Sequence, residues 1–542
     1  MRHFRNLLVS SVCLGLGAFA PVQAAPEPPA TGGEIVVRRL TPDQYQHIVR
    51  DVFGPTIKVN GRFEPEPRVN GLLALGAGKV SVSGAGLAGY EAMARDIADQ
   101  VVNPANRETL LPCSPKEARS ADDACARQVL SSVAKLMYRR TVSEGEIDGL
   151  VRNAGAAAGE LKDFYAGLSL SLAGLLVSPE FIFRKEVAAS SGDRIDAFSK
   201  ASRLSFFLWD TAPDSELLRA AAAGELDDQK GLSRQVERML ASPRLEDGVR
   251  AYFTDMLGFD AFHTLTKDAV LHPKFYADVP KDAAEQTMRT IVDHLLVRGG
   301  DYRDLFTTRN TFLTPVLGAV YRVPVAETGA NTEPSSWIAH EYPEGDSHIG
   351  LLTHASFVAL HSHPGRTSPT IRGKALREVF LCQKVPDPPG NVDFTVVQDT
   401  GNAIHRTARE RLKAHATEAM CTGCHKITDP MGLALENFDA SGGFRRDENG
   451  VAIDTSGELD GVKFTNVAGL SKVIHDHPAL TSCLVKRVYA YAAGRQPGVG
   501  EDAFVKYLTT GFSEDRYQLP ALLRRIATSD AFYRIAKQET AK

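Results

Sequence analysis

Arg203-Leu204-Ser205-Phe206-Phe207-Leu208-Trp209 is a run dense in large aromatic side chains. It continues a helical pattern that begins at Phe198, and this combination predicts a buried helix. Pro213-Asp214 starts another predicted helix, which Gly224 ends. Apolar residues at helical spacing then recur through 232–240 and 251–262. These segments predict an array of packed helices.

The helical pattern extends outward from this run in both directions. Thr41 and Pro42 suit the first positions of a helix that ends at Gly54. The Gly-rich part up to Gly89 favours short strands or loops, and a helix follows over 90–103. Residues 125–185 predict two helices with a turn near 155–160. We find no sustained strand-like alternation, and we therefore predict a mainly α fold.

Composition restricts the class of protein. The chain has 542 residues, of which 43% are hydrophobic and 24% are charged, and its formal net charge is -4. These values are ordinary for a soluble globular protein with more than one domain. The weak negative charge gives no reason to propose nucleic acid or an anionic membrane as a partner.

The N-terminus has the features of a secretory signal. Arg2, His3 and Arg5 precede an apolar run over 7–20, and Val22-Gln23-Ala24 is a small-x-small cleavage pattern. We predict a signal peptide over 1–24 and a mature periplasmic protein; an uncleaved membrane anchor is the alternative. No later stretch is apolar enough to cross a membrane.

Six cysteines remain after removal of the predicted signal. In an oxidising compartment, four of them favour two disulfides. Cys113 and Cys125 flank a polar loop and are expected to pair, which leaves Cys382 with Cys483. Sequence alone does not establish this connectivity.

The other two cysteines lie in Cys421-Thr422-Gly423-Cys424-His425. Cys-x-x-Cys-His is the attachment signature of a c-type haem, in which the thiols form thioethers and the histidine is the proximal iron ligand. The alternatives are a redox dithiol or disulfide, a chance match, and a zinc site that also uses His415.

The sixth iron ligand is open at this stage. Met431 lies only six residues after His425, so the chain would have to wrap tightly around the haem edge. Histidines could supply a nitrogen ligand instead, or the sixth position could be open. The candidates are Met431, His354, His361, His363, His475 and His477.

A polar loop precedes the motif. Arg366 and Arg372 could pair with haem propionates, because planar guanidinium groups suit carboxylates. Alternatively, they could satisfy local backbone carbonyls. Asp429, Glu436 and Asp439 after the motif favour helix capping and salt bridges to Arg445 or Arg446 over a pair of hydrolytic carboxylates.

Motifs along nearly the whole mature chain resemble a known family in their order. They include Leu40-Thr41, Tyr138-Arg139-Arg140, Ser178-Pro179-Glu180-Phe181, the run over 203–209, Ser242-Pro243-Arg244, Arg366-Thr367-Ser368-Pro369, the Cys-x-x-Cys-His motif, Asp429-Pro430-Met431-Gly432 and Gly494-Arg495. The family comprises large secreted proteins, abundant in planctomycetes, that string together contiguous domains of unknown function. The resemblance implies this architecture and a cytochrome c-like C-terminal region, but little about substrate.

These observations predict a multi-helix array followed by a cytochrome c-like, loop-rich helical C-terminal region. The expected segments are a signal at 1–24, an N-terminal region at 34–110, helical regions at 111–190 and 191–300, a connector at 301–347, a haem-motif region at 348–446 and a helical region at 447–542.

Three functions compete. The first is electron transfer by one covalent haem c with a periplasmic redox partner, as part of an oxidoreductase or as a carrier. The second is a haem peroxidase or oxygenase with an open sixth site. The third is a haem-free binding or scaffold protein with zinc or a disulfide at 421–425.

Overall fold

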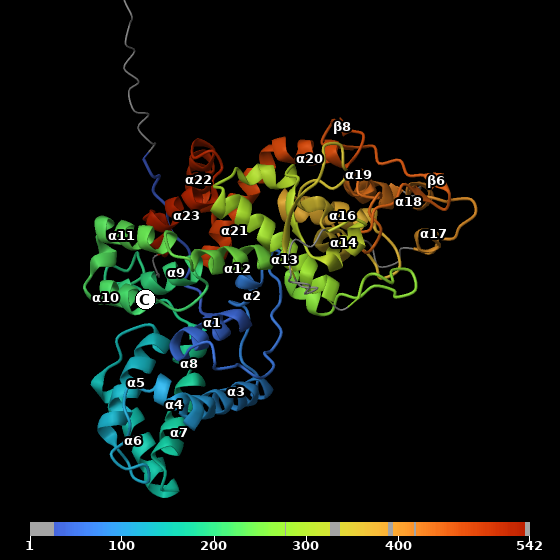
Figure 1. Ribbon diagram of the computed structural model, residues 1–542. Helices are drawn as coiled ribbons and strands as arrows, with labels where there is room; N and C mark the ends of the chain where they lie inside the picture. The colour runs from blue at the N-terminus through green and yellow to red at the C-terminus, as the bar shows by residue number, and fades with distance from the viewer. Residues whose placement is uncertain (1–25, 277, 326–335, 388–393, 417–418, 537–542) are drawn as a thin grey trace, which may run out of the picture.

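The computed structural model describes residues 26–276, 278–325, 336–387, 394–416 and 419–536 (Figure 1). The signal peptide predicted over 1–24 lies outside the described residues. Helices dominate the described chain, which confirms the mainly α prediction. The strands form two-stranded antiparallel pairs: β1 (Arg38–Arg39) with β2 (Phe183–Arg184), β3 (Asn310–Leu313) with β4 (Ile338–Glu341), β5 (Asp447–Glu448) with β6 (Val451–Ala452), and β7 (Gly457–Leu459) with β8 (Val462–Phe464).

An N-terminal unit has its own hydrophobic core. Its helices are α1 (Pro42–Phe53), α3 (Gly84–Val102), α4 (Pro104–Leu110), α5 (Asp123–Tyr138), α6 (Glu144–Leu161), α7 (Phe164–Leu176) and α8 (Pro179–Ile182). Buried side chains such as Tyr45, Leu130 and Leu168 fill this core. The Thr41 side chain accepts a hydrogen bond from the Gln44 N–H at the start of α1, as its sequence predicts. These helices form the blue-to-teal lobe of Figure 1.

A second, larger core extends over the rest of the chain. Its helices are α2 (Leu73–Gly76), α9 (Ala197–Leu208), α10 (Ser215–Ala222), α11 (Gln229–Leu240), α12 (Leu245–Leu257), α13 (Asp278–Val292), α14 (Pro315–Tyr321), α15 (Ala355–Leu360), α16 (Pro369–Ala375), α19 (Ala419–Leu433), α20 (Val467–Asp476), α21 (Pro478–Ala493), α22 (Asp502–Glu514) and α23 (Leu519–Thr528). The short helices α17 (Thr395–Gln398) and α18 (Ala408–His415) lie outside this core.

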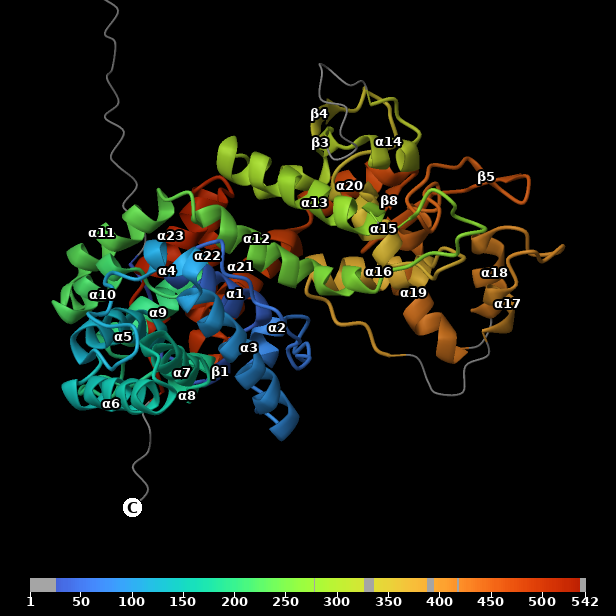
Figure 2. The same ribbon diagram turned by 60° about the horizontal axis from the view of Figure 1, so that its bottom comes forward.

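The C-terminal helices return to the middle of the chain. Helix α23 packs against α11, and α21 packs against α9, so red and green segments lie side by side in Figures 1 and 2. Helices α16 to α19 lie on the side of the molecule away from α5 to α8 in both views. The aromatic run over 203–209 is buried, as predicted.

Three local predictions are wrong. Residues 125–185 contain α5, α6, α7 and the short α8 rather than two helices. Arg139 adopts a left-handed conformation that ends α5, and Ser143 caps a new helix, α6, which continues past the expected turn at 155–160. Helix α3 begins at Gly84, inside the supposed loop region, because Ser83 caps it. The predicted irregular connector over 301–347 contains the β3–β4 pair and α14.

Both disulfides have the expected connectivity. Cys113 pairs with Cys125 beside α5, and Cys382 pairs with Cys483 on α21. The first closes a short loop with a sequence separation of 12, whereas the second has a separation of 101. The second bridge therefore fixes the segment after α16 to the C-terminal helices.

We expect the two disulfides to stabilise the protein unequally. Because the entropy of the unfolded chain falls more when a longer loop is closed, Cys382→Ser/Cys483→Ser should lower the free energy of unfolding by about 4.7 kcal/mol. Cys113→Ser/Cys125→Ser, the matched control, should lower it by about 3 kcal/mol. Denaturant titration measures both, and a larger loss in the Cys113/Cys125 variant would contradict this ranking.

Candidate functional site

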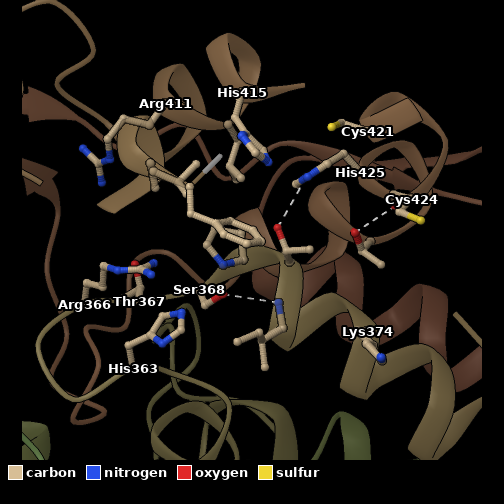
Figure 3. A pocket seen from close by; sticks show the side chains of 18 of the residues that line it. His363, Arg366, Thr367, Ser368, Lys374, Arg411, His415, Cys421, Cys424 and His425 are labelled. Atoms are coloured by element: carbon tan, nitrogen blue, oxygen red, sulfur yellow. Dashed lines mark hydrogen bonds between the residues drawn. The ribbon is translucent and has the colours of Figure 1, made fainter. Parts of the chain in front are cut away.

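The Cys-x-x-Cys-His motif lines a cavity of about 380 Å³ between α16, α18 and α19. Its apolar walls include Ile371, Val385, Phe394, Val397 and Leu412. In Figure 3, His363, Arg366 and Ser368 lie on one side of the cavity, and Cys421, Cys424 and His425 lie on the other. Pockets of this size that are largely apolar with a few polar groups are typical of sites for small molecules and cofactors.

Cys421 and Cys424 lie about one turn apart on α19 and both line the cavity. Both are free thiols, so the disulfide of the third hypothesis is not formed. Among the described residues, no group of three or more His, Cys, Asp or Glu side chains is placed to hold a metal ion. His415 lies beside His425, with ring centroids 5.1 Å apart.

The ring of His425 is fixed by a carboxylate on its own helix. Its Nδ1 lies 2.7 Å from Oδ2 of Asp429, one turn further along α19. The other carboxylate oxygen of Asp429 accepts a hydrogen bond of 2.8 Å from the Thr370 hydroxyl on α16. Within the described part of the chain, Nε2 of His425 makes no hydrogen bond. It is therefore the ring nitrogen that is free to bind a ligand.

Helices α16 and α19 approach each other at glycine. A Cβ added at Gly373 would lie 1.9 Å from the carbonyl oxygen of Thr428, and one added at Gly432 would lie 1.8 Å from that of Pro369. Any side chain there would force the backbones apart. This close contact brings Thr370 within reach of Asp429 and forms one wall of the cavity.

Arg372 lies outside the cavity and is fully buried. Its guanidinium donates to the carbonyl oxygens of Leu435 and Phe438, each at 2.9 Å, and pairs with Glu436 at 3.4 Å. Burial lowers the pKa of Arg372 to about 10. Arg372 therefore satisfies backbone carbonyls, which was the alternative role considered, and does not face the cavity where a propionate would lie.

Arg366 lines the cavity, in contrast to Arg372. Arg411 and Lys374 also line it, but they pair with Glu448 at 2.5 Å and Asp387 at 2.7 Å. Arg366 has no hydrogen bond or ion pair within the described ranges. Burial and the neighbouring positive charge of Arg411 lower the pKa of Arg366 below its usual value. An anion in the cavity would oppose both effects, because it would stabilise the charged guanidinium.

His363 is the only one of the sequence-derived sixth-ligand candidates that lines this cavity. Burial, Arg366 and Lys267 lower its pKa. The other candidates are engaged elsewhere: Met431 is fully buried in the core, His354 bonds to Thr287, His361 packs on Phe357, His475 contacts Asp304 and Asp476, and His477 contacts Asp460.

The roles of Thr370 and Asp429 were missed from sequence. Asp429 was expected to cap a helix or form a salt bridge rather than to belong to a hydrolytic pair of carboxylates, although its spacing of four residues from His425 places both on one helical face. No local pattern relates Thr370 to the motif, because it lies 55 residues before His425. The expected salt bridge from Arg445 is formed with Glu436 at 2.8 Å.

The glycine contact between α16 and α19 predicts the effect of a single methyl group. Gly432→Ala should lower the free energy of unfolding by about 1–3 kcal/mol, because the Pro369 backbone has to move. Gly174→Ala on α7, where no atom lies within 4 Å, should raise it by about 0.5–1 kcal/mol. Thermal unfolding of both variants measures this, and a neutral Gly432→Ala would refute the close contact.

Comparison with known families gives five matches in chain order. They are to proteins of unknown function described as DUF1587 over 38–103, DUF1595 over 125–186, DUF1592 over 195–323, DUF1588 over 348–448 and DUF1585 over 460–532. The DUF1592 match extends into the segment expected to be a connector, and the DUF1588 match contains the cavity motif. No curated protein and no solved structure matches the chain. The chain is thus a contiguous array of these five domains of unknown function, of the planctomycete type that its motifs resemble.

Proposed function

We propose that this chain is a periplasmic c-type haem protein that takes part in electron transfer. The observation that carries the proposal is the cavity in which Cys421, Cys424 and His425 meet. The two free thiols on one helix are the groups that would form thioethers, and His425 would be the proximal ligand through Nε2.

The remaining lining of the cavity suits a haem. Ile371, Phe394 and Leu412 offer an apolar surface for the macrocycle. Arg366, which has no partner in the described chain, offers a guanidinium for a propionate. When bound, haem would supply reversible one-electron chemistry.

His363 is our candidate for the sixth ligand, because it lines the cavity and Met431 is buried in the core. With His363 bound, the iron would have no open position, which favours electron transfer over peroxide or oxygen chemistry. Haem in the ferric protein should then lack the charge-transfer band of a thioether ligand. A rapid reaction with peroxide would instead favour the peroxidase alternative.

One observation supports a periplasmic location, where the proposed redox partner would also lie. Both disulfides are of the kind that persists in oxidising compartments. In the residues that the structure describes, no helix is both long and apolar enough to cross a membrane.

Expression with the c-type maturation machinery should give one covalent haem per chain. A pyridine haemochrome spectrum of the denatured protein measures this, because only thioether-bound haem stays on the chain. Cys421→Ala/Cys424→Ala should lose the signal, whereas Gly423→Ala, which keeps both thiols and contacts nothing within 4 Å, should retain it. A wild-type protein without covalent haem would contradict the proposed function.

Arg366 should raise the reduction potential, because a positive charge near haem favours the reduced form. Arg366→Gln should therefore lower the potential by the equivalent of about 1 kcal/mol, or roughly 40 mV for one electron. Lys413→Gln on the exposed side of α18 is the control for charge and should have a smaller effect. Spectroelectrochemical titration measures the difference, and equal shifts in both variants would rule out the contact.

A further inference from the structure

We infer that Asp429, held in place by Thr370, is a positioning residue for His425 that gives the site a low reduction potential. This inference rests on the proposed function, because it concerns a haem bound through His425. It implies that the redox partner is an electron donor with a low reduction potential.

The contacts of Asp429 use both of its carboxylate oxygens. One oxygen lies 2.7 Å from Nδ1 of His425, and the other accepts a hydrogen bond of 2.8 Å from the Thr370 hydroxyl. The Thr428 hydroxyl lies 3.2 Å from this second oxygen, but its shorter bond, 2.9 Å, goes to the carbonyl oxygen of Cys424. Asp429 is 7% exposed, so water competes little for these bonds. The direction of the carboxylate is therefore fixed by His425 on α19 and Thr370 on α16, two helices that touch at glycine.

The charge of Asp429 is directed at the imidazole ring. Its partner is the Nδ1 of His425, and no Lys or Arg pairs with Asp429 in the part of the chain that the structure describes. The Thr370 hydroxyl bonds to the second carboxylate oxygen without neutralising it. Other acids in this region are paired with cations, as Glu436 is with Arg372 and Arg445.

This arrangement has two consequences for a haem ligand. The Nδ1–H of His425 donates to Asp429, which fixes the tautomer and leaves the Nε2 lone pair for iron. A carboxylate partner also makes the imidazole a stronger electron donor. Because the ferric state carries more positive charge than the ferrous state, a strong donor and a nearby anion both favour it. The potential therefore falls, and only a donor of low potential would reduce the site.

The test compares reduction potentials of the full-length holoprotein and of Asp429→Asn. Asparagine has the same shape but carries no charge, so the equilibrium constant for reduction by a fixed donor should rise at least tenfold, which is about 59 mV for one electron. Asp447→Asn is the matched control, since it removes an exposed carboxylate from β5 and should change the constant less than twofold.

The outcomes separate the two proposals. Absence of covalent haem in the wild-type protein would overturn the proposed function. Haem in both proteins with unchanged potentials would overturn only the role of Asp429.

If Asp429→Asn fails to fold or to take up haem, a measurement on the wild-type protein still tests the role of Asp429. Resonance Raman spectroscopy after photolysis of its carbon monoxide complex reports the iron–histidine stretch. A high frequency, as for an imidazole bonded to a carboxylate, is expected. The lower frequency of an imidazole bonded to a neutral acceptor would overturn the inference.

Discussion

The close contact of α16 and α19 at Gly373 and Gly432 is the constraint on which the candidate site depends. It brings the backbones together without intervening side chains, and it places Thr370 against Asp429. The Arg372 guanidinium then ties α16 to the carbonyl groups that follow α19. As a result, α19 carries the two thiols and the His425 ring along one wall of the cavity. The glycine contact, the Thr370–Asp429 bond and the Arg372 bonds hold this wall against α16.

The C-terminal helices connect the segment after α16 to the rest of the larger core. The C-terminal helices pack back onto α9 and α11, and the Cys382–Cys483 bridge joins them to the segment that follows α16. The N-terminal unit has a separate core, and its helices α5 to α8 lie away from α16, α18 and α19 in both ribbon views (Figures 1 and 2). The array of five domains thus forms two packed units, of which the larger carries the motif.

Sequence patterns predicted features that depend on neighbouring residues. The cap at Thr41, the buried run over 203–209, both disulfide pairs and the motif at 421–425 were all available from local spacing or simple pairing. The predicted helix boundaries were wrong where a helix continued through a glycine, as α6 does at Gly155. They were also wrong where a residue in the left-handed conformation, such as Arg139, ended a helix. The sequence could not distinguish Arg366 in the polar loop from Arg372 in the helix that follows it, because only the tertiary packing turns one into the cavity and the other into the core.

Histidine ligands show the same limit. His363 and His361 lie two residues apart, yet the first lines the cavity and the second packs on Phe357. The partnership of Thr370, Asp429 and His425 requires two helices in contact, which no single stretch encodes.

The mass of the purified mature protein, produced with the c-type maturation machinery, decides whether the motif carries a covalent haem. We expect one haem to remain attached under denaturing conditions, and we expect peptide mapping to place it on the segment with Cys421 and Cys424. A mature chain with two unmodified thiols at these positions would contradict it.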